Sequence, residues 1–475
     1  MRTYDVAIIG AGSAGLSALK EVQKKTESYI VIDDGPLGTT CARVGCMPSK
    51  AFIQVANDFH RRHKFAQIGI HGAEKLSVDT SEVMKHVRVL RDRFAGGVER
   101  GMQAWEKAHL LRERATFIDQ NTLQVGKEKI RAERIIIATG SKPIWPEKWR
   151  EFKDYIVDTD QFFELEKLPK KMAVIGLGVI GVELGQALSR LGVEIIGISL
   201  EKVIGGLSDP AIQNYTFNTL NEEFKIILSP AEILGVKNNQ LEIKAGNEVF
   251  YVEKALVALG RAPQIKNLGL EKIGLQLDAR GMPTFDKSTF RIQNSPLYIV
   301  GDVNGERPIL HEASDEGRIA GYNSVRSEDQ CFVRREFMSI TFSSPQIVIV
   351  GKSFKELQAS KENFVVGEVS FEGQGRALTS LSNKGLAHIY ADKHSGRLLG
   401  AEMMAPQAEH FAHLLAWVMS YHKNVYDVLS LPFYHPVLEE GLRTAFRDLS
   451  EKIEFSPPPL EVLRCQDNAL MLQKA

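Results

Sequence analysis

The chain is poor in cysteine, balanced in charge and without a long apolar run. Only four of its 475 residues are cysteine, and neither Cys331 nor Cys465 has another Cys or a His at a metal-ligand spacing, which argues against a structural zinc site. The apolar run at residues 6–9 is too short for a signal-peptide core or a membrane span. Lys plus Arg and Asp plus Glu number 59 each, so the net charge indicates neither nucleic acid nor an anionic membrane as a partner. We therefore expect a cytoplasmic protein with no metal site.

The other two cysteines lie five residues apart in the stretch T-T-C-A-R-V-G-C-M-P-S-K, residues 39–50. Apolar residues at steps of three and four predict a helix after Pro48. In a regular helix, residues five apart have Cα atoms about 8.7 Å apart, whereas a disulfide needs less than about 7 Å. A bridge therefore requires the irregular turn that Gly45 and Pro48 permit. Because strained disulfides are readily reduced and so short a loop removes little unfolded-state entropy, a redox pair is favoured over a metal site or a structural staple.

A strand followed by a glycine-rich turn begins the chain. The apolar run of residues 4–9 leads into the sequence G-A-G-S-A-G. There Gly10 permits a tight turn, Gly12 lets the backbone approach a pyrophosphate, and Gly15 allows close packing of helix and strand. The helix that follows directs the positive end of its dipole at the phosphates. A second apolar run ends in Asp33, which is placed to accept a hydrogen bond from a ribose hydroxyl, so the pattern predicts a dinucleotide site.

The same pattern recurs in the second quarter of the chain. The apolar run of residues 172–175 leads into G-L-G-V-I-G, and a helix and a second strand follow. The three glycines of this turn are Gly176, Gly178 and Gly181. Two dinucleotide sites and one closely spaced cysteine pair predict a circuit in which one site holds a flavin, the other holds a nicotinamide, and the cysteines exchange electrons with the flavin.

The second site lacks an acidic residue where the first has Asp33. The equivalent position is Ser199, and the nearest carboxylate is Glu201. Residues 191–260 contain no arginine, so a 2′-phosphate would have only Lys202 nearby to neutralise its charge. The sequence therefore favours NAD over NADP.

With these motifs the chain resembles the class I pyridine nucleotide-disulfide oxidoreductase family. The stretch C-A-R-V-G-C-M-P-S-K is similar to the C-x4-C-x-P-S-K signature of that family. Four further segments resemble family elements, namely residues 135–140 and Thr289 with 298–302 for the FAD motifs, 258–263 for the exit from the nicotinamide domain, and 434–440 for the H-P element near the carboxyl end. Within the family, the resemblance is greatest to the dihydrolipoyl dehydrogenases.

The resemblance implies roles for four residues. Cys41 is expected to be the thiol that meets the sulfur of the substrate, and Cys46 the thiol nearest the flavin, where a cation or helix end favours the thiolate. His435 is expected to be the general base for the substrate thiol, with Glu440 orienting its ring. In the family this histidine comes from the other subunit, so a homodimer with active sites built from two chains is implied.

The resemblance also implies the residues around both cofactors. Lys50 and Glu183 correspond to an ion pair beside the reactive nitrogen of the flavin. The residues expected around FAD are Gly10, Gly12, Gly15, Asp33, Lys50, Thr139, Gly140 and Asp302. Those expected around NAD are Gly176, Gly178, Gly181, Glu183, Ser199, Gly260 and Arg261.

By the same resemblance, the expected fold is α/β, with two doubly wound dinucleotide-binding domains, for FAD and NAD(P), and a carboxyl-terminal α+β dimerisation domain. The expected segments are an FAD-binding segment (1–148), an NAD(P)-binding domain (149–268), a return to the FAD side (269–332) and an interface domain (333–475). In the last segment, residues 364–369 and 385–389 read as strands and residues 408–421 as a long apolar helix suited to a dimer contact.

The favoured reaction is the oxidation of dihydrolipoamide to lipoamide with NAD+ through the cysteine pair and FAD, with a 2-oxoacid dehydrogenase complex as a candidate partner. The alternatives are an NAD(P)H-dependent reductase of another disulfide or of a metal ion, as in glutathione or mercuric reductases, and a non-catalytic redox-sensing flavoprotein. Five departures from the family pattern bear on this choice, and one of them is the missing acidic residue at the second site. Another is that the usual H-x-H-P motif reads F-Y-H-P at residues 433–436. Thr39 stands where the motif has glycine, Arg43 replaces an asparagine, and a longer tail from about Asp448 contains Cys465. Arg43 has two readings: a cation that stabilises a thiolate or attracts an anionic substrate, and a surface charge.

Overall fold

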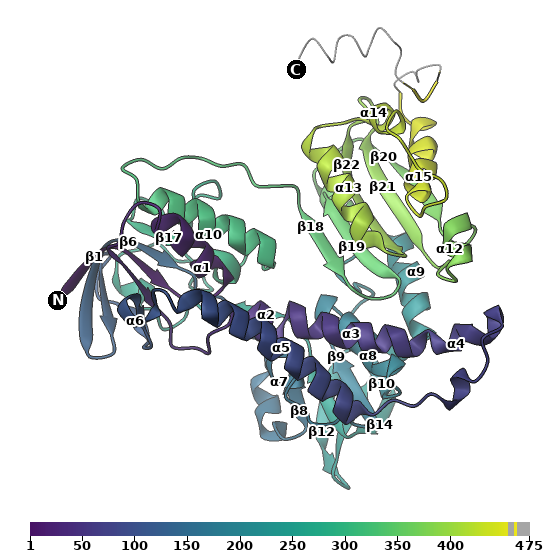
Figure 1. Cartoon of the computed structure of the whole chain (residues 1–475), viewed down its shortest axis with the longest axis horizontal. Helices are drawn as coiled ribbons and strands as arrows, with labels where there is room; N and C mark the ends of the chain where they lie inside the picture. The colour runs from purple at the N-terminus through teal and green to yellow at the C-terminus, as the bar shows by residue number, and fades with distance from the viewer. Residues whose placement is uncertain (455–459, 463–475) are drawn as a thin grey trace.

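The computed structural model describes residues 1–454 and 460–462. Its elements form two sheets covered by helices and a third, antiparallel sheet with helices packed against it (Figure 1). One of the first two sheets is parallel, and the other is parallel except at β4 (Ala115–Phe117) and β5 (Thr122–Val125), which pair antiparallel. In this view the first two sheets lie to the left and below, and the antiparallel sheet stands above them. The architecture is the expected α/β fold with a carboxyl-terminal α+β domain.

The first sheet is built from the amino-terminal segment and from one later strand. Its strands are β1 (Arg2–Ile9), β2 (Tyr29–Ile32), β3 (Leu110–Leu111), β4 (Ala115–Phe117), β5 (Thr122–Val125), β6 (Glu128–Ile137) and β17 (Leu297–Ile299). They are ordered β3-β2-β1-β6-β5-β4, and β17 pairs with β6. Strands β3, β2, β1, β6 and β17 run parallel, and their central residues are apolar and buried, as expected for a sheet covered on both faces. Through β17 the chain returns to this sheet after forming the second one.

Two helices on this sheet meet backbone to backbone. Helix α1 (Ser13–Val22) follows the first glycine-rich turn, and α10 (Leu310–Ser324) packs against it; the two are seen side by side in Figure 1. A Cβ atom on Gly317 would lie 2.2 Å from the carbonyl oxygen of Ala14, and one on Gly321 would lie 2.3 Å from that of Ala18. Only glycine allows this approach, because any larger residue would overlap the backbone of α1.

Replacing Gly317 with Ala is expected to force α1 and α10 apart. Overpacking typically costs about 1–3 kcal/mol, so the free energy of unfolding, measured by urea denaturation, should fall by at least about 1 kcal/mol. Gly373→Ala is the matched control, because no atom lies within 4 Å of the Cβ position there. Equal stability of the two variants would contradict the packing argument.

The cysteine segment leads into a helical arm. Its helices are α2 (Thr40–Val44), α3 (Cys46–His60), α4 (Arg62–Phe65), α5 (Thr80–Met102) and α6 (Glu106–His109), with 3-10 turns at Ala66–Ile68 and Ala73–Lys75. Helix α3 begins at Cys46, three residues before the start expected after Pro48. Pro48 lies in the first turn of α3, where its missing N–H costs no helical hydrogen bond. The second cysteine therefore starts a helix rather than preceding one.

The second parallel sheet carries the second glycine-rich turn. Its strands are β8 (Ile156–Asp158), β9 (Lys171–Ile175), β10 (Glu194–Ser199), β11 (Lys225–Leu228) and β15 (Lys254–Val257), in the order β11-β10-β9-β15-β8 and all parallel. The helices are α7 (Thr159–Phe162), α8 (Val179–Arg190) and α9 (Pro210–Asn221). A three-stranded antiparallel sheet of β12 (Ala231–Lys237), β13 (Gln240–Ala245) and β14 (Glu248–Val252) extends this part of the chain. The pair β7 (Ser141–Pro143) and β16 (Arg261–Pro263) links it to the first sheet.

The third sheet is antiparallel and belongs to the carboxyl-terminal segment. Its strands are β18 (Met338–Thr341), β19 (Gln346–Gly351), β20 (Phe364–Ser370), β21 (Leu386–Asp392) and β22 (Leu398–Ala405), in the order β18-β19-β22-β21-β20. The helices are α11 (Phe354–Ala359), α12 (Gly375–Thr379), α13 (Ala408–Ser420), α14 (Val425–Leu429) and α15 (Glu440–Ser450). The two strands and the long helix expected in this segment are present as β20, β21 and α13, with small shifts at their ends.

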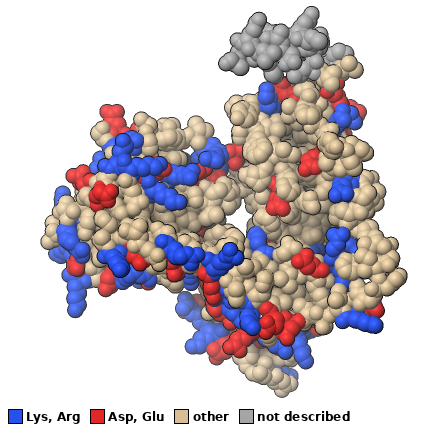
Figure 2. All heavy atoms as spheres, in the orientation of Figure 1, with Lys and Arg blue, Asp and Glu red and all other residues tan. Residues whose placement is uncertain are grey.

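The outer side of α13 presents large apolar side chains to solvent. Leu414, Trp417 and, just after the helix, Tyr421 are exposed. Figure 2 shows positive and negative side chains interspersed over most of the visible face, whereas the surface over α13 is largely uncharged. Within the described part of the chain, no helix combines the length and apolarity needed to cross a membrane.

Candidate active site

The two cysteines lie on either side of a helix break. Cys41 is in α2, and Cys46 begins α3. Between them Gly45 has φ −120° and ψ −117°, which is not helical. A Cβ atom on Gly45 would lie 3.2 Å from both the Cα of Cys41 and the carbonyl oxygen of Thr40. The irregular turn expected from the sequence is therefore present, and glycine leaves the room for it.

The pKa values of the two thiols are shifted in opposite directions. A hydrogen bond from Cys41, followed by the charge of Lys50, lowers the pKa of Cys46 to about 7 and outweighs the opposing effect of desolvation. The hydrogen bond to Cys46, followed by burial, raises the pKa of Cys41 well above its usual range. Both cysteines are in the free thiol state. In the reduced pair the thiolate therefore resides on Cys46 and the proton on Cys41.

Thr39 adopts a backbone conformation that favours glycine. Its φ is 65° and its ψ is 148°, a region that a β-branched residue occupies only under strain. The Thr39 hydroxyl accepts a weak hydrogen bond, 3.4 Å long, from the N–H of Ala42 in the first turn of α2. The sequence difference from the family motif at this position is therefore a strained residue that partly compensates by capping a helix.

Replacing Thr39 with Gly is expected to stabilise the protein. Relief of backbone strain is worth about 1–3 kcal/mol, whereas the flexibility of glycine costs about 0.5–1 kcal/mol. The free energy of unfolding should rise by about 1 kcal/mol in urea denaturation. Thr39→Ala keeps the positive φ and loses the cap, so it should be less stable than the parent; a Gly variant no more stable than the Ala variant would contradict the strain argument.

Lys50 and Glu183 form a partly buried ion pair between α3 and α8. Both carboxylate oxygens of Glu183 lie 2.9 Å from Nζ of Lys50. The backbone N–H of Phe342 donates to the same carboxylate at 2.9 Å, and the ammonium lies 4.4 Å from the centre of the Phe342 ring. Glu183 is only 4% exposed. The pair fixes a positive charge beside Cys46, since Lys50 is the cation that lowers the pKa of that thiol.

His435 and Glu440 are joined near the carboxyl end. His435 Nδ1 lies 3.0 Å from Oε1 of Glu440, the first residue of α15. The hydrogen bond with His435, supported by one from the N–H of Val437, lowers the pKa of Glu440. The side chain of His435 is 82% exposed. The carboxylate therefore orients a ring whose Nε2 is directed away from it, free to exchange a proton with another molecule.

The first glycine-rich turn has the shape needed to hold a pyrophosphate. Gly10 has φ 111°, and a Cβ atom there would lie 2.3 Å from the carbonyl oxygen of Ala138. At Gly12, where α1 begins, no atom lies within 4 Å of the Cβ position, so the helix end is open to a phosphate. Asp33 accepts from the N–H of Ala11 at 2.6 Å and from that of Gly35 at 2.8 Å. These residues fit the adenine-dinucleotide part of FAD.

The second turn repeats this geometry. Gly176 has φ 96°, and a Cβ atom there would lie 2.4 Å from the carbonyl oxygen of Ala258. Gly178 again has no atom within 4 Å of its Cβ position. The contacts with Ala138 and Ala258 were not expected from the sequence, although the matching tripeptides A-T-G and A-L-G that begin at these residues carry a signal for them.

Other expected site residues form a hydrogen-bonded link between the two nucleotide regions. The hydroxyl of Ser141 donates to Asp302 at 2.7 Å and accepts from Nε of Arg261 at 2.9 Å. Arg261 also pairs with Asp160 at 2.9 Å. The sequence reasoning missed Ser141 and Asp160, which tie the guanidinium of Arg261 between the sheets.

The remaining expected residues lie at the ends of the sheets. Thr139 donates to the carbonyl of Gln264 at 2.7 Å, close to Gly140, which has φ 69°. The hydroxyl of Ser199, at the end of β10, donates to the carbonyl of Glu201 at 2.9 Å. Gly260 has φ 93° at the end of the second sheet.

The other two cysteines take no part in this site. Cys331 is a free, exposed thiol, and Cys465 lies outside the described residues. The described residues contain no group of three or more His, Cys, Asp or Glu side chains able to hold a metal ion. The aliphatic stem of Arg43 lies beside Gly38, where a Cβ atom would be 3.3 Å from it. That Arg43 stabilises a thiolate or attracts an anionic substrate, and that it is a surface charge, both stay predictions.

Two family models match nearly the whole chain. Residues 4–317 match the model for pyridine nucleotide-disulphide oxidoreductases, and residues 337–446 match the dimerisation domain of the same family. The chain belongs to this family, in class I. As a member, it is a flavin-dependent oxidoreductase that works with FAD and a nicotinamide nucleotide, and its dimerisation domain supports a homodimer.

Individual relatives agree with this membership. The mitochondrial dihydrolipoyl dehydrogenase of Homo sapiens is 30% identical over 485 residues, which cover 94% of this chain and 92% of that protein. The dihydrolipoyl dehydrogenase of Thermus scotoductus is 30% identical over 467 residues, covering 95% and 98%. Among solved structures, the Cu(II) complex of the HOCl-induced flavoprotein disulfide reductase RclA from Escherichia coli has a TM-score of 0.81 at 20% identity, covering 94% of this chain and 99% of that chain. This last likeness is one of fold alone.

Proposed function

We propose that the protein oxidises dihydrolipoamide to lipoamide with NAD+ as acceptor. The observation that carries the proposal is the cysteine pair, in which Cys46 has a pKa of about 7 and lies under the influence of the fixed charge of Lys50. A thiol of this acidity is a good leaving group in thiol-disulfide exchange at neutral pH. The names of the relatives at 30% identity support dihydrolipoamide as the dithiol.

The cysteines carry the exchange in two balanced steps. In the oxidised enzyme a substrate thiolate attacks Sγ of Cys41, which breaks the Cys41–Cys46 disulfide and releases Cys46 as the thiolate. The second substrate thiol then attacks the mixed disulfide, which releases cyclic lipoamide and leaves Cys41 as a thiol. The substrate loses two electrons and two protons. The cysteine pair gains the two electrons, the thiol of Cys41 takes one proton, and His435 takes the other.

One proton from the substrate passes to the histidine. His435, supplied by the second subunit, takes the proton from the attacking thiol at Nε2, and Glu440 stabilises the resulting imidazolium through Nδ1. The hydrogen bond with His435 lowers the pKa of Glu440, so the contact favours the ionised carboxylate that this role needs.

The bound flavin supplies the two-electron carrier between the dithiol and the nicotinamide. The residues that would hold it are Gly10, Gly12, Gly15, Asp33, Lys50, Thr139, Gly140 and Asp302. Those that would hold NAD are Gly176, Gly178, Gly181, Glu183, Ser199, Gly260 and Arg261. The absence of an arginine from residues 191–260 supports NAD over NADP.

The setting of the reaction is also part of the proposal. The exposed apolar side of α13 supports a homodimer contact. The proposed substrate makes a 2-oxoacid dehydrogenase complex in the cytoplasm a candidate partner.

The segment boundaries 1–148, 149–268, 269–332 and 333–475 stay a proposal. The return of β17 to the first sheet supports it.

Replacing Cys46 with Ser is expected to abolish the oxidation of dihydrolipoamide while FAD stays bound. Serine cannot form the disulfide that receives the substrate electrons. The initial rate of NAD+ reduction should fall to background, and the flavin absorbance of the purified variant should match that of the parent. Cys331→Ser removes a free exposed thiol outside the pair and should keep full activity. Full activity in the Cys46 variant would exclude the mechanism.

Replacing His435 with Gln is expected to slow turnover by a factor of about 100 to 10,000, because the general base is lost. His71→Gln, at an exposed loop position, should leave the rate unchanged. An unaltered rate would remove His435 from the mechanism.

A further inference from the structure

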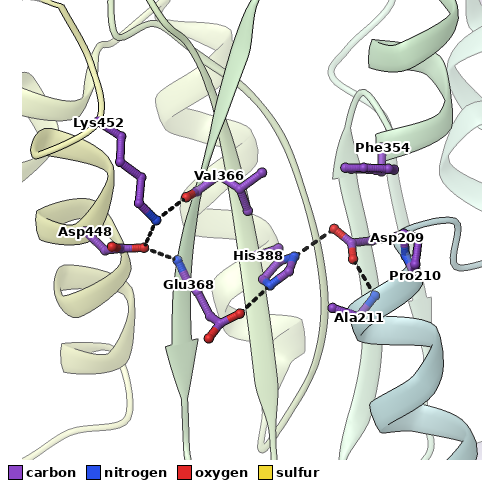
Figure 3. Close-up of a pocket in the computed structure, with 9 residues that line it drawn as sticks. All are labelled: Asp209, Pro210, Ala211, Phe354, Val366, Glu368, His388, Asp448 and Lys452. Carbon is purple, nitrogen blue, oxygen red and sulfur yellow. Dashed lines mark hydrogen bonds and ion pairs between the residues drawn. The ribbon is translucent and has the colours of Figure 1, made fainter.

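A buried histidine joins the nucleotide region of α9 to the antiparallel sheet. His388 lies on β21 and is 8% exposed. Its Nδ1 is 2.7 Å from Oδ2 of Asp209, and its Nε2 is 2.8 Å from Oε2 of Glu368 (Figure 3). A ring with both nitrogens this close to carboxylate oxygens donates from both, so His388 is an imidazolium. Asp209, Glu368 and His388 are called the His388 latch below.

The two oxygens of Asp209 serve different parts of the molecule. Oδ1 accepts from the N–H of Ala211 at 2.9 Å and so caps the start of α9. Oδ2 accepts from His388 and, at 2.9 Å, from the hydroxyl of Tyr390, both on β21. Asp209 is 2% exposed. One buried carboxylate therefore begins a helix of the second nucleotide region and holds it to the antiparallel sheet.

A second buried carboxylate accepts hydrogen bonds from the backbone at Ser208 and Asp209. Glu402 on β22 is fully buried and accepts from the N–H groups of Ser208 at 2.6 Å and Asp209 at 2.9 Å. Glu368, His388 and Glu402 are successive cross-strand neighbours on β20, β21 and β22. The sheet thus presents a row of acid, base and acid to the segment just before α9.

That segment reaches the second glycine-rich turn directly. The N–H of Gly205 donates to the carbonyl of Leu177 at 3.0 Å, and Leu177 lies between the first two glycines of the turn. Ile204 and Leu207 on either side are fully buried. A Cβ atom on Gly205 would lie 2.9 Å from the side chain of Ile347 on β19, so the segment has little freedom to move on its own.

We propose that the His388 latch positions the second glycine-rich turn and that protonation of His388 thereby tunes the affinity for the nicotinamide nucleotide. This inference rests on the proposed function in one respect, the assignment of that turn to the nucleotide. The side-chain partners of His388 are Asp209 and Glu368, and none of these residues is assigned to the nucleotide or the substrate, so we class His388 as a positioning residue.

The latch titrates in a polar setting. Burial lowers the pKa of His388, but the hydrogen bonds with Asp209 and Glu368 outweigh it, and the net shift is upward. Burial raises the pKa of Asp209, but the bonds from His388 and Tyr390 outweigh it, and the net shift is downward. The other titratable groups around the ring are Glu402 on β22, Tyr390 on β21, and Asp448 and Lys452 on α15. A hollow of about 580 Å³ beside the latch, lined by Glu368, Asp448 and Lys452 among others, gives solvent access to it (Figure 3).

The direction of the pH dependence follows from the raised pKa. The stabilising contribution of His388 is complete below its unfolded pKa of about 6.5 and is lost as the pH rises through the higher folded value. Above that value the neutral ring keeps one donated hydrogen bond, and its other nitrogen faces a carboxylate as an acceptor. The latch then weakens, because a neutral hydrogen bond is roughly half as strong as a charged one.

The test is the dissociation constant of NAD+ and of NADP+, measured by calorimetry on the flavin-loaded protein between about pH 6 and pH 9. For the parent we expect the constant of the preferred nucleotide to rise roughly fivefold as His388 loses its proton. His388→Gln should show the high value at every pH. Glu368→Gln, at the exposed rim of the latch, should keep the transition but move it to lower pH.

A matched control is available in the same domain. His394 pairs with Glu454 and contacts Asn363, all outside the latch, so His394→Gln should follow the parent at every pH. Flavin reduction by dihydrolipoamide without nucleotide should be unchanged in all variants, because the latch contacts neither the cysteine pair nor His435.

The outcomes separate this inference from the proposed function. A parent-like pH profile in His388→Gln, or an unmoved transition in Glu368→Gln, would overturn the latch even if both variants lost thermal stability. If dihydrolipoamide fails to reduce the flavin of the parent while the nucleotide profiles behave as expected, the proposed substrate is wrong and the latch stands.

Discussion

The carboxylate of Glu183 is the contact on which the arrangement of the active site depends. It holds Lys50 on the helix that begins with Cys46, and it accepts the N–H of Phe342 from the carboxyl-terminal segment. Glu183 itself lies on the helix of the second glycine-rich turn. Three segments of the chain therefore meet at one buried side chain, and breaking a buried ion pair from one side leaves an uncompensated charge that typically costs about 3–5 kcal/mol. The positive charge near Cys46 is thus a consequence of how the domains are assembled.

Buried carboxylates recur where segments meet. Asp209 and Glu402 join the start of α9 to the antiparallel sheet, much as Glu183 joins α8 to α3 and to Phe342. Each carboxylate accepts hydrogen bonds from the backbone and from a side chain. These directed hydrogen bonds offset the cost of burying its charge. Such contacts fix orientation more narrowly than apolar packing does, which suits a protein that must align a dithiol, a flavin and a nicotinamide.

The parts of the fold and of the candidate site that depend on neighbouring residues could be predicted from the sequence. The parts that depend on contacts between distant residues could not. Both glycine-rich turns, the strands that precede them and the helix break at Gly45 follow from residue types within a few positions of one another. The positive φ of Thr39 was visible only as a mismatch with the family motif. In contrast, Asp209 meets His388 across 179 residues. Ser141 and Asp160 engage Arg261 across 120 and 101 residues. No periodicity or spacing in the sequence predicts such pairs, because they form only when the sheets pack together.

The most direct test of the central claim is the steady-state rate of the purified, flavin-loaded protein with dihydrolipoamide, with NAD+ and NADP+ compared as acceptors. The account predicts NAD+ reduction at about 10 s⁻¹ or faster, as for typical enzymes, and a much lower rate with NADP+. Little turnover with dihydrolipoamide, together with rapid NADPH oxidation in the presence of another disulfide, would contradict it and would make Arg43 the first residue to test for substrate choice.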